Sequence, residues 1–473
     1  MQSEINWGTV LSRAAPRLSG LAALSLFSVL SAVVVIRFSL AARPITDDYC
    51  TAQSVFANGF WSTYVWYNSN WGLIWFGNAL WIGAWLVTDS HVVLAVKGLV
   101  LFGLVGVCLY GVLRQVCRRS SRFEFVLATG SAVGGLILGL ASARENGSTV
   151  IWAITPQVTL RLYAIFLILL CLLIFLNSGT RNFFRSHPWA SVMIAIVAGL
   201  LLGGNGPAEG LTAVVALVLA PAVFRLQSVD ARPYLAASIA CFTITVIQAS
   251  TSLIARTDAT GARDLDQVVL GLKGSLAHQL SAMGPSVLVS GIAVGVAIGL
   301  ILGGLAPSLG KWILMVLVML LSSLAFVALT ESFSYISGWH HLPSSVLFSL
   351  LVILLGIALS SLISRFLTLT VPRHERLWAT LTGIVFLLLI AMLFSGPVMT
   401  AMRLQETRAE YWDDRSYISL SVGRNVMQTV PFLDFKGGRM LEDIGQGAAS
   451  IRFGRPYEVG YMEWCFARLP VGF

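Results

Sequence analysis

Long apolar runs, separated by short polar segments, dominate the pattern of this chain. Each run can form a helix that crosses a bilayer, and a helix satisfies its own backbone hydrogen bonds there. The pattern predicts eleven spans, with approximate cores at residues 19–40, 91–116, 125–143, 158–177, 189–204, 208–224, 234–254, 285–305, 312–330, 344–365 and 378–400. Only the short turn NGPAE separates the fifth and sixth runs. A re-entrant hairpin is the alternative for this pair, and it would reverse the orientation of all that follows.

Two segments break the apolar pattern. Residues 41–90 are dense in Trp and Tyr, and Trp71, Trp75 and Trp85 fall near helical spacing around Asn78. This segment predicts interfacial amphipathic helices. Residues 403–473 are rich in charge and contain strand-like stretches. The expected fold class is therefore all-α and polytopic, with about eleven transmembrane helices in residues 1–402, interfacial helices in the first outer loop, and a small extracytoplasmic α/β cap in residues 403–473.

Composition supports the membrane assignment. The chain of 473 residues is 56% hydrophobic and 11% charged, with a mean hydropathy of +0.81. Soluble domains carry about 25% charged residues. The lipid bilayer is thus the expected partner. The net charge of +9 is better explained by basic residues on the cytoplasmic side of the membrane than by nucleic-acid binding.

The distribution of Lys and Arg predicts the orientation. With a cytoplasmic N-terminus, the inner segments carry fourteen basic residues and the outer loops before the last span carry five, as the positive-inside rule expects. The inner residues are Arg13, Arg17, Arg114, Arg118, Arg119, Arg122, Arg181, Arg185, Arg225, Arg232, Lys311, Arg365, Arg373 and Arg376, and the outer ones are Arg43, Arg144, Arg256, Arg263 and Lys273. The C-terminus is then extracytoplasmic.

Most carboxylates fall on the predicted outer side. They are Asp47, Asp48, Asp89, Glu145, Glu209, Asp258, Asp264, Asp266 and Glu331, against Glu124, Asp230 and Glu375 inside. Every outer connection in the transmembrane region contains at least one carboxylate. We therefore expect several outer loops to contribute to one polar chamber.

Asp47 and Asp48 are adjacent and directly follow the first span. An acidic pair can simply cap the next helix, because carboxylates near a helix N-terminus satisfy its free N–H groups. Alternatively, one carboxylate can act as a general base, or the pair can hold a divalent metal ion between them. Mutual repulsion raises the pKa of one member, which helps it to accept a proton.

Other polar residues of the outer segments are candidate ligand contacts. Glu145 and Glu209 sit where helices enter the outer polar layer, where ionisable groups face either a wet cavity or the interface. Trp152, Gln157, Arg161 and Tyr163 follow Glu145 closely and could line the same chamber.

Cationic side chains near the outer surface are candidate contacts for an anionic head group. Arg256 and Arg263 could bind a phosphate, since guanidinium matches it bidentately. His340 and His341 could bind phosphate or transfer a proton. For the arginines the alternative is a plain solvated loop, and for the histidines it is a loop pair that neither binds phosphate nor transfers a proton.

The chain lacks the sequence motifs of several common enzyme classes. There is no Walker A, no GxGxxG after a strand, no HExxH and no GxSxG. The cytoplasmic loops are too short for a nucleotide-binding domain. No CxxC or His/Cys metal spacing occurs, and Cys50 and Cys465 are the two cysteines outside the apolar runs. The expected substrate is therefore one delivered at the outer face, and a membrane lipid is the natural carrier.

The order of short motifs resembles the GT-C superfamily of membrane glycosyltransferases. The motifs are TDDYC, ENGSTVIWAIT, GPAE, TDATGARD, YWDDRSYI and EWCFARL, and they are similar to those of a bacterial GT-C-like family of mostly unassigned substrate. One departure is Leu73 in NSNWGLIW, where that family leads us to expect a basic residue.

The resemblance implies a polytopic enzyme of the bacterial inner membrane with an extracytoplasmic active site. It would move a sugar from a polyprenyl-phosphate donor to a cell-envelope acceptor, generally with inversion. Asp47 would be the base and Asp48 its orienting or metal-binding neighbour. Arg256 and Arg263 would neutralise the phosphate, and Glu145 and Glu209 would bind sugar hydroxyls or the acceptor. The rival hypotheses are a lipid-linked glycan polymerase or ligase, and a transporter or flippase.

Overall fold

The structure is a computed structural model that describes residues 7–40, 46–70, 74–84, 90–117, 121–142, 156–260, 265–302, 305–333 and 342–370, together with positions 383 and 399. Within these residues every regular element is an α-helix. The helices are α1 (Trp7–Leu40), α2 (Thr46–Asn70), α3 (Trp75–Ala84), α4 (Ser90–Val116), α5 (Arg122–Ser142), α7 (Pro156–Leu176), α8 (Ser178–Ser186), α9 (Pro188–Gly203), α10 (Pro207–Phe224), α11 (Ser228–Thr260), α12 (Leu265–Ala282), α13 (Pro285–Leu302), α14 (Ser308–Phe333) and α15 (Leu342–Thr370).

Six of the described helices are long and apolar enough to cross a membrane. They contain Leu21–Leu40, Val96–Val116, Pro207–Phe224, Ser228–Thr251, Ser308–Thr330 and Leu342–Ile363. A seventh is counted if α7 and α8 form one broken span, bent by 67°. The chain is thus a multi-pass helical membrane protein. The remaining spans of the predicted eleven are not established by these helices. Residues 378–400 and the predicted cap at 403–473 lie outside the described residues, apart from the isolated positions 383 and 399.

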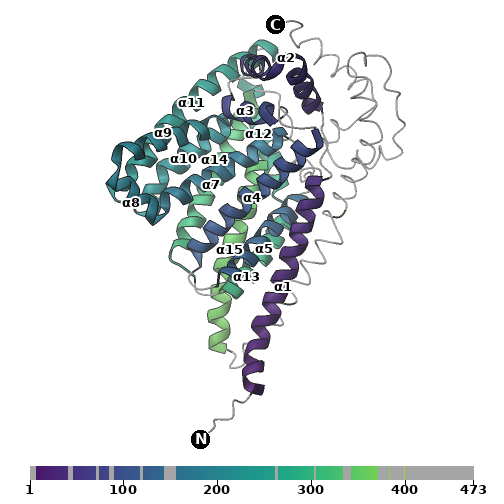
Figure 1. The fold of residues 1–473 in the computed structure, drawn as a ribbon, viewed down its shortest axis with the longest axis vertical. Coiled ribbons are helices and arrows are strands. Elements are labelled where there is room, and N and C mark those ends of the chain that lie inside the picture. The colour runs from purple at the N-terminus through teal and green to yellow at the C-terminus, as the bar shows by residue number, and fades with distance from the viewer. Residues whose placement is uncertain are drawn as a thin grey trace, which may run out of the picture.

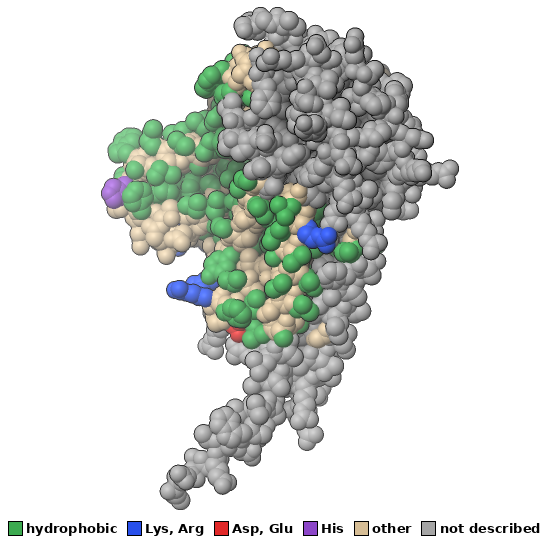
Figure 2. All heavy atoms as spheres, turned by 45° about the vertical axis from the view of Figure 1, so that its right-hand side comes forward, with side chains coloured by type: hydrophobic (Ala, Val, Ile, Leu, Met, Phe, Trp, Pro, Cys, Tyr) green, Lys and Arg blue, Asp and Glu red, His purple; other side chains and the backbone are tan. Residues whose placement is uncertain are grey.

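Large apolar side chains cover much of the described surface. Figure 2 shows mainly hydrophobic side chains on one face, with few charged ones among them. On α9 and α11, for example, Trp189, Ile239 and Phe242 are exposed. In water such a surface would be an aggregation liability, whereas lipid solvates it. The exposed surface therefore fits a bilayer environment.

The helices form two groups joined by α7 and α14. In one group α11 packs on α9 and α10, and in the other α1, α4, α5, α13 and α15 pack together. The α9–α11 crossing is very close, because a Cβ added to Gly199 would lie 2.2 Å from the carbonyl oxygen of Ala237. Small residues permit such close backbone approach in membrane helices. This crossing fixes where the turn between α9 and α10 lies.

One end of the bundle gathers segments predicted to be extracytoplasmic. The backbone N–H groups of Phe76 and Gly77, in α3, both donate to the carbonyl oxygen of Gly204 in the α9–α10 turn, at 3.1 Å. Figure 1 shows α2 and α3 at the opposite end of the molecule from the start of α1. The predicted first outer loop and the NGPAE turn therefore share one end of the bundle.

The opposite end gathers segments predicted to be cytoplasmic. The end of α4 contacts the start of α14, where Trp312 Nε1 donates to Gln115 Oε1 at 2.9 Å. Arg185 of α8 and Asp230 of α11 form an ion pair nearby, with 2.6 Å between Nη2 and Oδ2. This grouping agrees with the predicted alternation of the chain. Which end faces the cytoplasm stays a prediction.

Cysteine labelling tests that orientation. Cys108, Cys117, Cys171 and Cys241 are buried, so they should contribute little background. We expect a membrane-impermeant maleimide to label Cys50 and Cys465 in intact cells after mild reduction. The Cys50→Ser/Cys465→Ser variant is the matched control and should stay unlabelled. Labelling of either cysteine only after the membrane is permeabilised would contradict the topology. Labelling that requires the reductant would indicate a disulfide between them.

Candidate functional site

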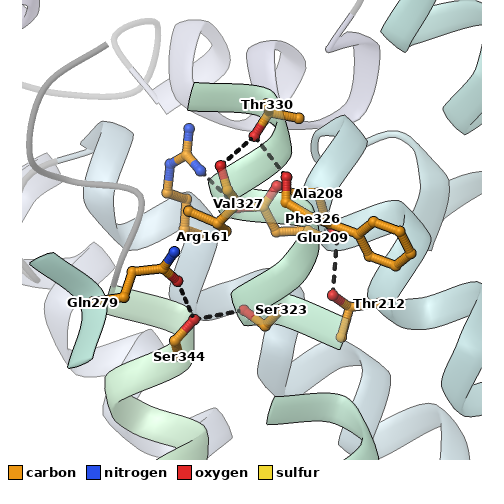
Figure 3. A network of polar contacts seen from close by, with 10 residues as sticks. All are labelled: Arg161, Ala208, Glu209, Thr212, Gln279, Ser323, Phe326, Val327, Thr330 and Ser344. Carbon is orange, nitrogen blue, oxygen red and sulfur yellow. Dashed lines mark hydrogen bonds and ion pairs between the residues drawn. The ribbon is translucent and has the colours of Figure 1, made fainter. Parts of the chain in front are cut away.

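An ion pair between two helices marks the end of the bundle that α2 and α3 cover. Arg161 Nη1 of α7 lies 2.8 Å from Glu209 Oε1 of α10, and the side chains are 23% and 4% exposed respectively. Figure 3 shows this contact among polar groups of neighbouring helices. Glu209 lies in the first turn of α10, where the helix dipole favours a carboxylate. The dipole and the guanidinium together offset the cost of burying this charge.

The turn before α10 determines the position of Glu209. Gly206 has φ +157°, and a Cβ added there would lie 2.6 Å from Glu209 Oε2. A larger residue would therefore displace the carboxylate. The preceding Asn205 donates its amide hydrogens to the carbonyl oxygens of Leu201 and Leu202, at 2.9 and 3.3 Å. The sequence NGPAE thus forms a tight turn that holds the carboxylate against α7.

An aromatic cap covers this end of the bundle. We define it as the two helices α2 and α3 with their buried cluster of Val55, Tyr67, Trp81 and Ile82. Leu160, the residue before Arg161, packs against this cluster. Asn78 Nδ2 of α3 also donates to Asn68 Oδ1 of α2 at 3.0 Å. The cap is therefore attached both to the turn and to the start of α7.

Two further features of the cap are a kink in its first helix and a tyrosine with a raised pKa. Gly59 has φ +78° and kinks α2, a conformation that few other residues adopt readily. Burial raises the pKa of Tyr64, which its hydrogen bond with Asn68 lowers by less.

A second polar cluster lies deeper between α12, α14 and α15. Gln279 Oε1 accepts from Ser344 Oγ at 3.0 Å, and Ser344 Oγ lies 3.0 Å from Ser323 Oγ. Gln279 Nε2 donates to Ser275 Oγ and to the carbonyl oxygen of Leu324, each at 3.3 Å. Figure 3 shows this cluster near Arg161 and Glu209. The buried amide of Gln279 is fully partnered, so this cluster is a structural connection between helices.

The structure describes only part of the predicted site. Asp47 and Asp48 are in the first turn of α2, Gln157 is in the first turn of α7, and Arg256 is near the end of α11. Nothing is described of these four side chains. The other predicted contacts lie outside the described residues, and they are Glu145, Trp152, Arg263, His340 and His341. Of the residues to which the resemblance assigns a role, Glu209 is the one whose side chain is described.

The structure also adds residues that the sequence interpretation did not select. Asn205 lies within the NGPAE motif, and its position inside a turn was the available signal. Gln248 is an amide within the apolar run of α11, which is a costly placement in a membrane. Arg161 was noted in the sequence, but its pairing with Glu209 depends on tertiary packing.

Metal binding by the acidic pair remains untested. In the part of the chain that the structure describes, no three His, Cys, Asp or Glu side chains gather as a metal site would require. The side chains of Asp47 and Asp48 are not among those described. The divalent ion between them is thus still a prediction.

Comparison of the chain with protein-family models, with curated proteins and with solved structures finds no match. The class of protein defined by the fold is therefore a multi-pass helical membrane protein.

Proposed function

We propose that the chain is a GT-C-type glycosyltransferase of the bacterial inner membrane. It would transfer a sugar from a polyprenyl-phosphate donor to a cell-envelope acceptor on the extracytoplasmic face. The proposal rests mainly on the position of α2. This helix begins at the acidic doublet and is attached to the end of the bundle that holds Arg161 and Glu209. The acidic doublet, a potential base, thus stands at the start of the helix that covers the Arg161–Glu209 ion pair.

The proposed reaction uses the acidic doublet as base. Asp47 removes the proton from an acceptor hydroxyl, and the hydroxyl oxygen attacks the anomeric carbon of the sugar. The bond between that carbon and the phosphate oxygen breaks, and polyprenyl phosphate leaves with the electron pair. Attack opposite the leaving group inverts the anomeric centre. Asp48 orients Asp47 or shares a divalent ion with it.

The leaving phosphate needs positive charge at the membrane boundary. Arg256 and Arg263 are the proposed source of that charge, since guanidinium groups stabilise the negative charge that develops on a leaving phosphate. Glu145 and Glu209, with Trp152 and Gln157, would contact the sugar or the acceptor. His340 and His341 remain candidate phosphate or proton-transfer groups in the same proposal.

The positions of the described carboxylates argue against a transporter or flippase. Proton and ion sites of transporters usually lie near the middle of the membrane. Here Glu124, Glu209 and Asp230 all lie in the first turn of a helix. A lipid-linked glycan polymerase or ligase would share the lipid carrier, and the identity of the transferred unit separates it from a glycosyltransferase.

A deletion strain tests the proposed function. We expect mass spectrometry of its surface glycans and glycoproteins to show the loss of one sugar, with accumulation of the matching polyprenyl-phosphate sugar. Complementation with the wild-type gene should restore both. Unchanged glycans together with an unchanged lipid-linked sugar pool would contradict the proposal. Loss of whole repeat units would instead indicate a polymerase or ligase.

A further inference from the structure

Three side chains around the α9–α10 turn carry buried polar atoms that have no hydrogen-bond partner among the described residues. These atoms are Trp75 Nε1, Asn205 Oδ1, and both Nε2 and Oε1 of Gln248. Gln248 is completely buried. A buried polar group without a partner destabilises the folded state. In native proteins such groups mark backbone strain, a catalytic role, or a bound water or ion.

Two of these side chains lie directly at the turn. A Cβ added to Gly204 would lie 2.7 Å from Trp75 Nε1, so the indole N–H lies against the turn backbone. Asn205 is the next residue, and its free Oδ1 belongs to an amide whose nitrogen is already engaged with α9. A donor from α3 therefore lies against the turn, and the next residue of the turn supplies an acceptor.

The helical register brings Gln248 to the same level of the bundle as this turn. Cys241 and Thr245 form a stripe on α11 that faces α9 and α10, because Cys241 Sγ donates to the carbonyl oxygen of Gly210. In addition, a Cβ added to Gly210 would lie 2.2 Å from Thr245 Oγ1. Gln248 is one helical turn beyond Thr245 on this stripe. It thus lies level with the turn at which α10 begins.

The charge balance of the turn selects the class of ligand. The carboxylate of Glu209 is paired with Arg161 at 2.8 Å, so these two groups contribute no net charge. The unpartnered atoms supply neutral donors and acceptors together. Neutral hydroxyl groups, each able to donate and accept, match such a set. A charged ligand would need an opposite charge that this pair does not provide.

We propose that the α9–α10 turn binds the neutral polyhydroxylated ring of a sugar. Trp75 and Gln248 donate to ring hydroxyls, and Asn205 and Gln248 accept from them. The inference deepens the proposed function and rests on it, since it assigns the sugar of the lipid-linked donor to this turn. It also implies a neutral sugar in preference to an amino sugar or a uronic acid.

Substitution of Gln248 by Met tests the site. Met has a similar volume and a good helix propensity, so the change removes little but the amide. Because this amide has no protein partner, we expect a higher thermal unfolding midpoint in lipid nanodiscs. The affinity for geranyl phosphomannose, relative to geranyl phosphate, should fall about tenfold, as expected for lost buried hydrogen bonds. The same affinity ratio is measured with the glucose, galactose and arabinose derivatives. Glucuronate and aminoarabinose derivatives then show whether the site prefers neutral over charged sugars.

Gln279→Met is the matched control. Its amide is equally buried but is partnered by Ser275, Ser344 and Leu324. This variant should lower the unfolding midpoint and leave the affinity ratio unchanged.

Three results would overturn the site. One is a lower midpoint for Gln248→Met, which would show that its amide has a partner within the protein. Another is an unchanged affinity ratio in this variant, which would indicate bound water only. The third is a wild-type protein that prefers no sugar derivative over geranyl phosphate. A wild-type protein that transfers sugar, with an unaltered preference in Gln248→Met, would overturn this inference alone. Binding that depends on Gln248, without any transfer by the wild type, would overturn the proposed function and support the site.

Discussion

Asp47→Asn is expected to abolish detectable sugar transfer while the protein still folds and inserts into the membrane. Asn has nearly the same shape as Asp, but its amide cannot accept the proton of an acceptor hydroxyl. Loss of a general base lowers a rate by about 10²–10⁴. Transfer is measured with protein reconstituted in liposomes, and folding is measured by thermal unfolding of the same preparation. An N-capping role alone would lower stability modestly and leave the rate nearly unchanged.

Two variants make this experiment specific. Asp266 is the second residue of α12, as Asp47 is of α2, and it is exposed at the start of its helix. Asp266→Asn should therefore transfer sugar at the wild-type rate. Asp48→Asn should retain part of the activity, because Asp48 acts by orienting its neighbour or by binding a metal ion. Full activity in Asp47→Asn would exclude Asp47 as the base. If only Asp48→Asn loses activity, Asp48 is the base and Asp47 its neighbour in the supporting role.

Arg161→Met is expected to produce the largest loss of stability. It leaves the carboxylate of Glu209, 4% exposed, without its cationic partner. Removing one partner of a buried pair costs about 3–5 kcal/mol. The partial exposure of Arg161 and the dipole of α10 reduce this cost, so we expect the free energy of unfolding to fall by about 2–3 kcal/mol. The free energy of unfolding in detergent micelles is the measurement.

A double-mutant cycle separates the ion pair from other effects. Adding Glu209→Gln to Arg161→Met should restore most of the stability, because no unpaired charge is then buried. Arg185→Met is the control at the opposite end, where it breaks the pair with Asp230. It should lower stability without altering donor affinity, whereas Arg161→Met should reduce both. Additive effects in the cycle would contradict the coupling that we assign to this pair.

The apolar pattern predicted the membrane helices well where a run was long and uninterrupted. It did not predict α8, which follows α7 at 67°. The N-cap of α8 is Asn177, whose side chain accepts a hydrogen bond from the N–H of Gly179. The segment also combines Phe183 and Phe184 with Arg181 and Arg185. Its charges predicted an inner connection, and its amphipathic pattern was the available signal for a helix.

The candidate site shows the same division between local and tertiary information. Glu209 could be selected from the sequence because a carboxylate beside Gly and Pro at the end of an apolar run is conspicuous. Its pairing with Arg161 joins residues 48 positions apart, and no local pattern encodes that contact. Gln248 reaches the turn only through the register between α9, α10 and α11. The lack of any partner for its amide among the described residues becomes visible only once these helices are packed.

The most direct test of the account is turnover by the purified protein in liposomes. The donor is a polyprenyl phosphate carrying one neutral sugar, and an envelope extract supplies the acceptor. We expect the wild-type protein to consume the donor, with equal amounts of polyprenyl phosphate released and sugar incorporated, and we expect Asp47→Asn to do neither. Failure to consume any lipid-linked donor with wild-type protein, or release of polyprenyl phosphate at the same rate by Asp47→Asn, would contradict it.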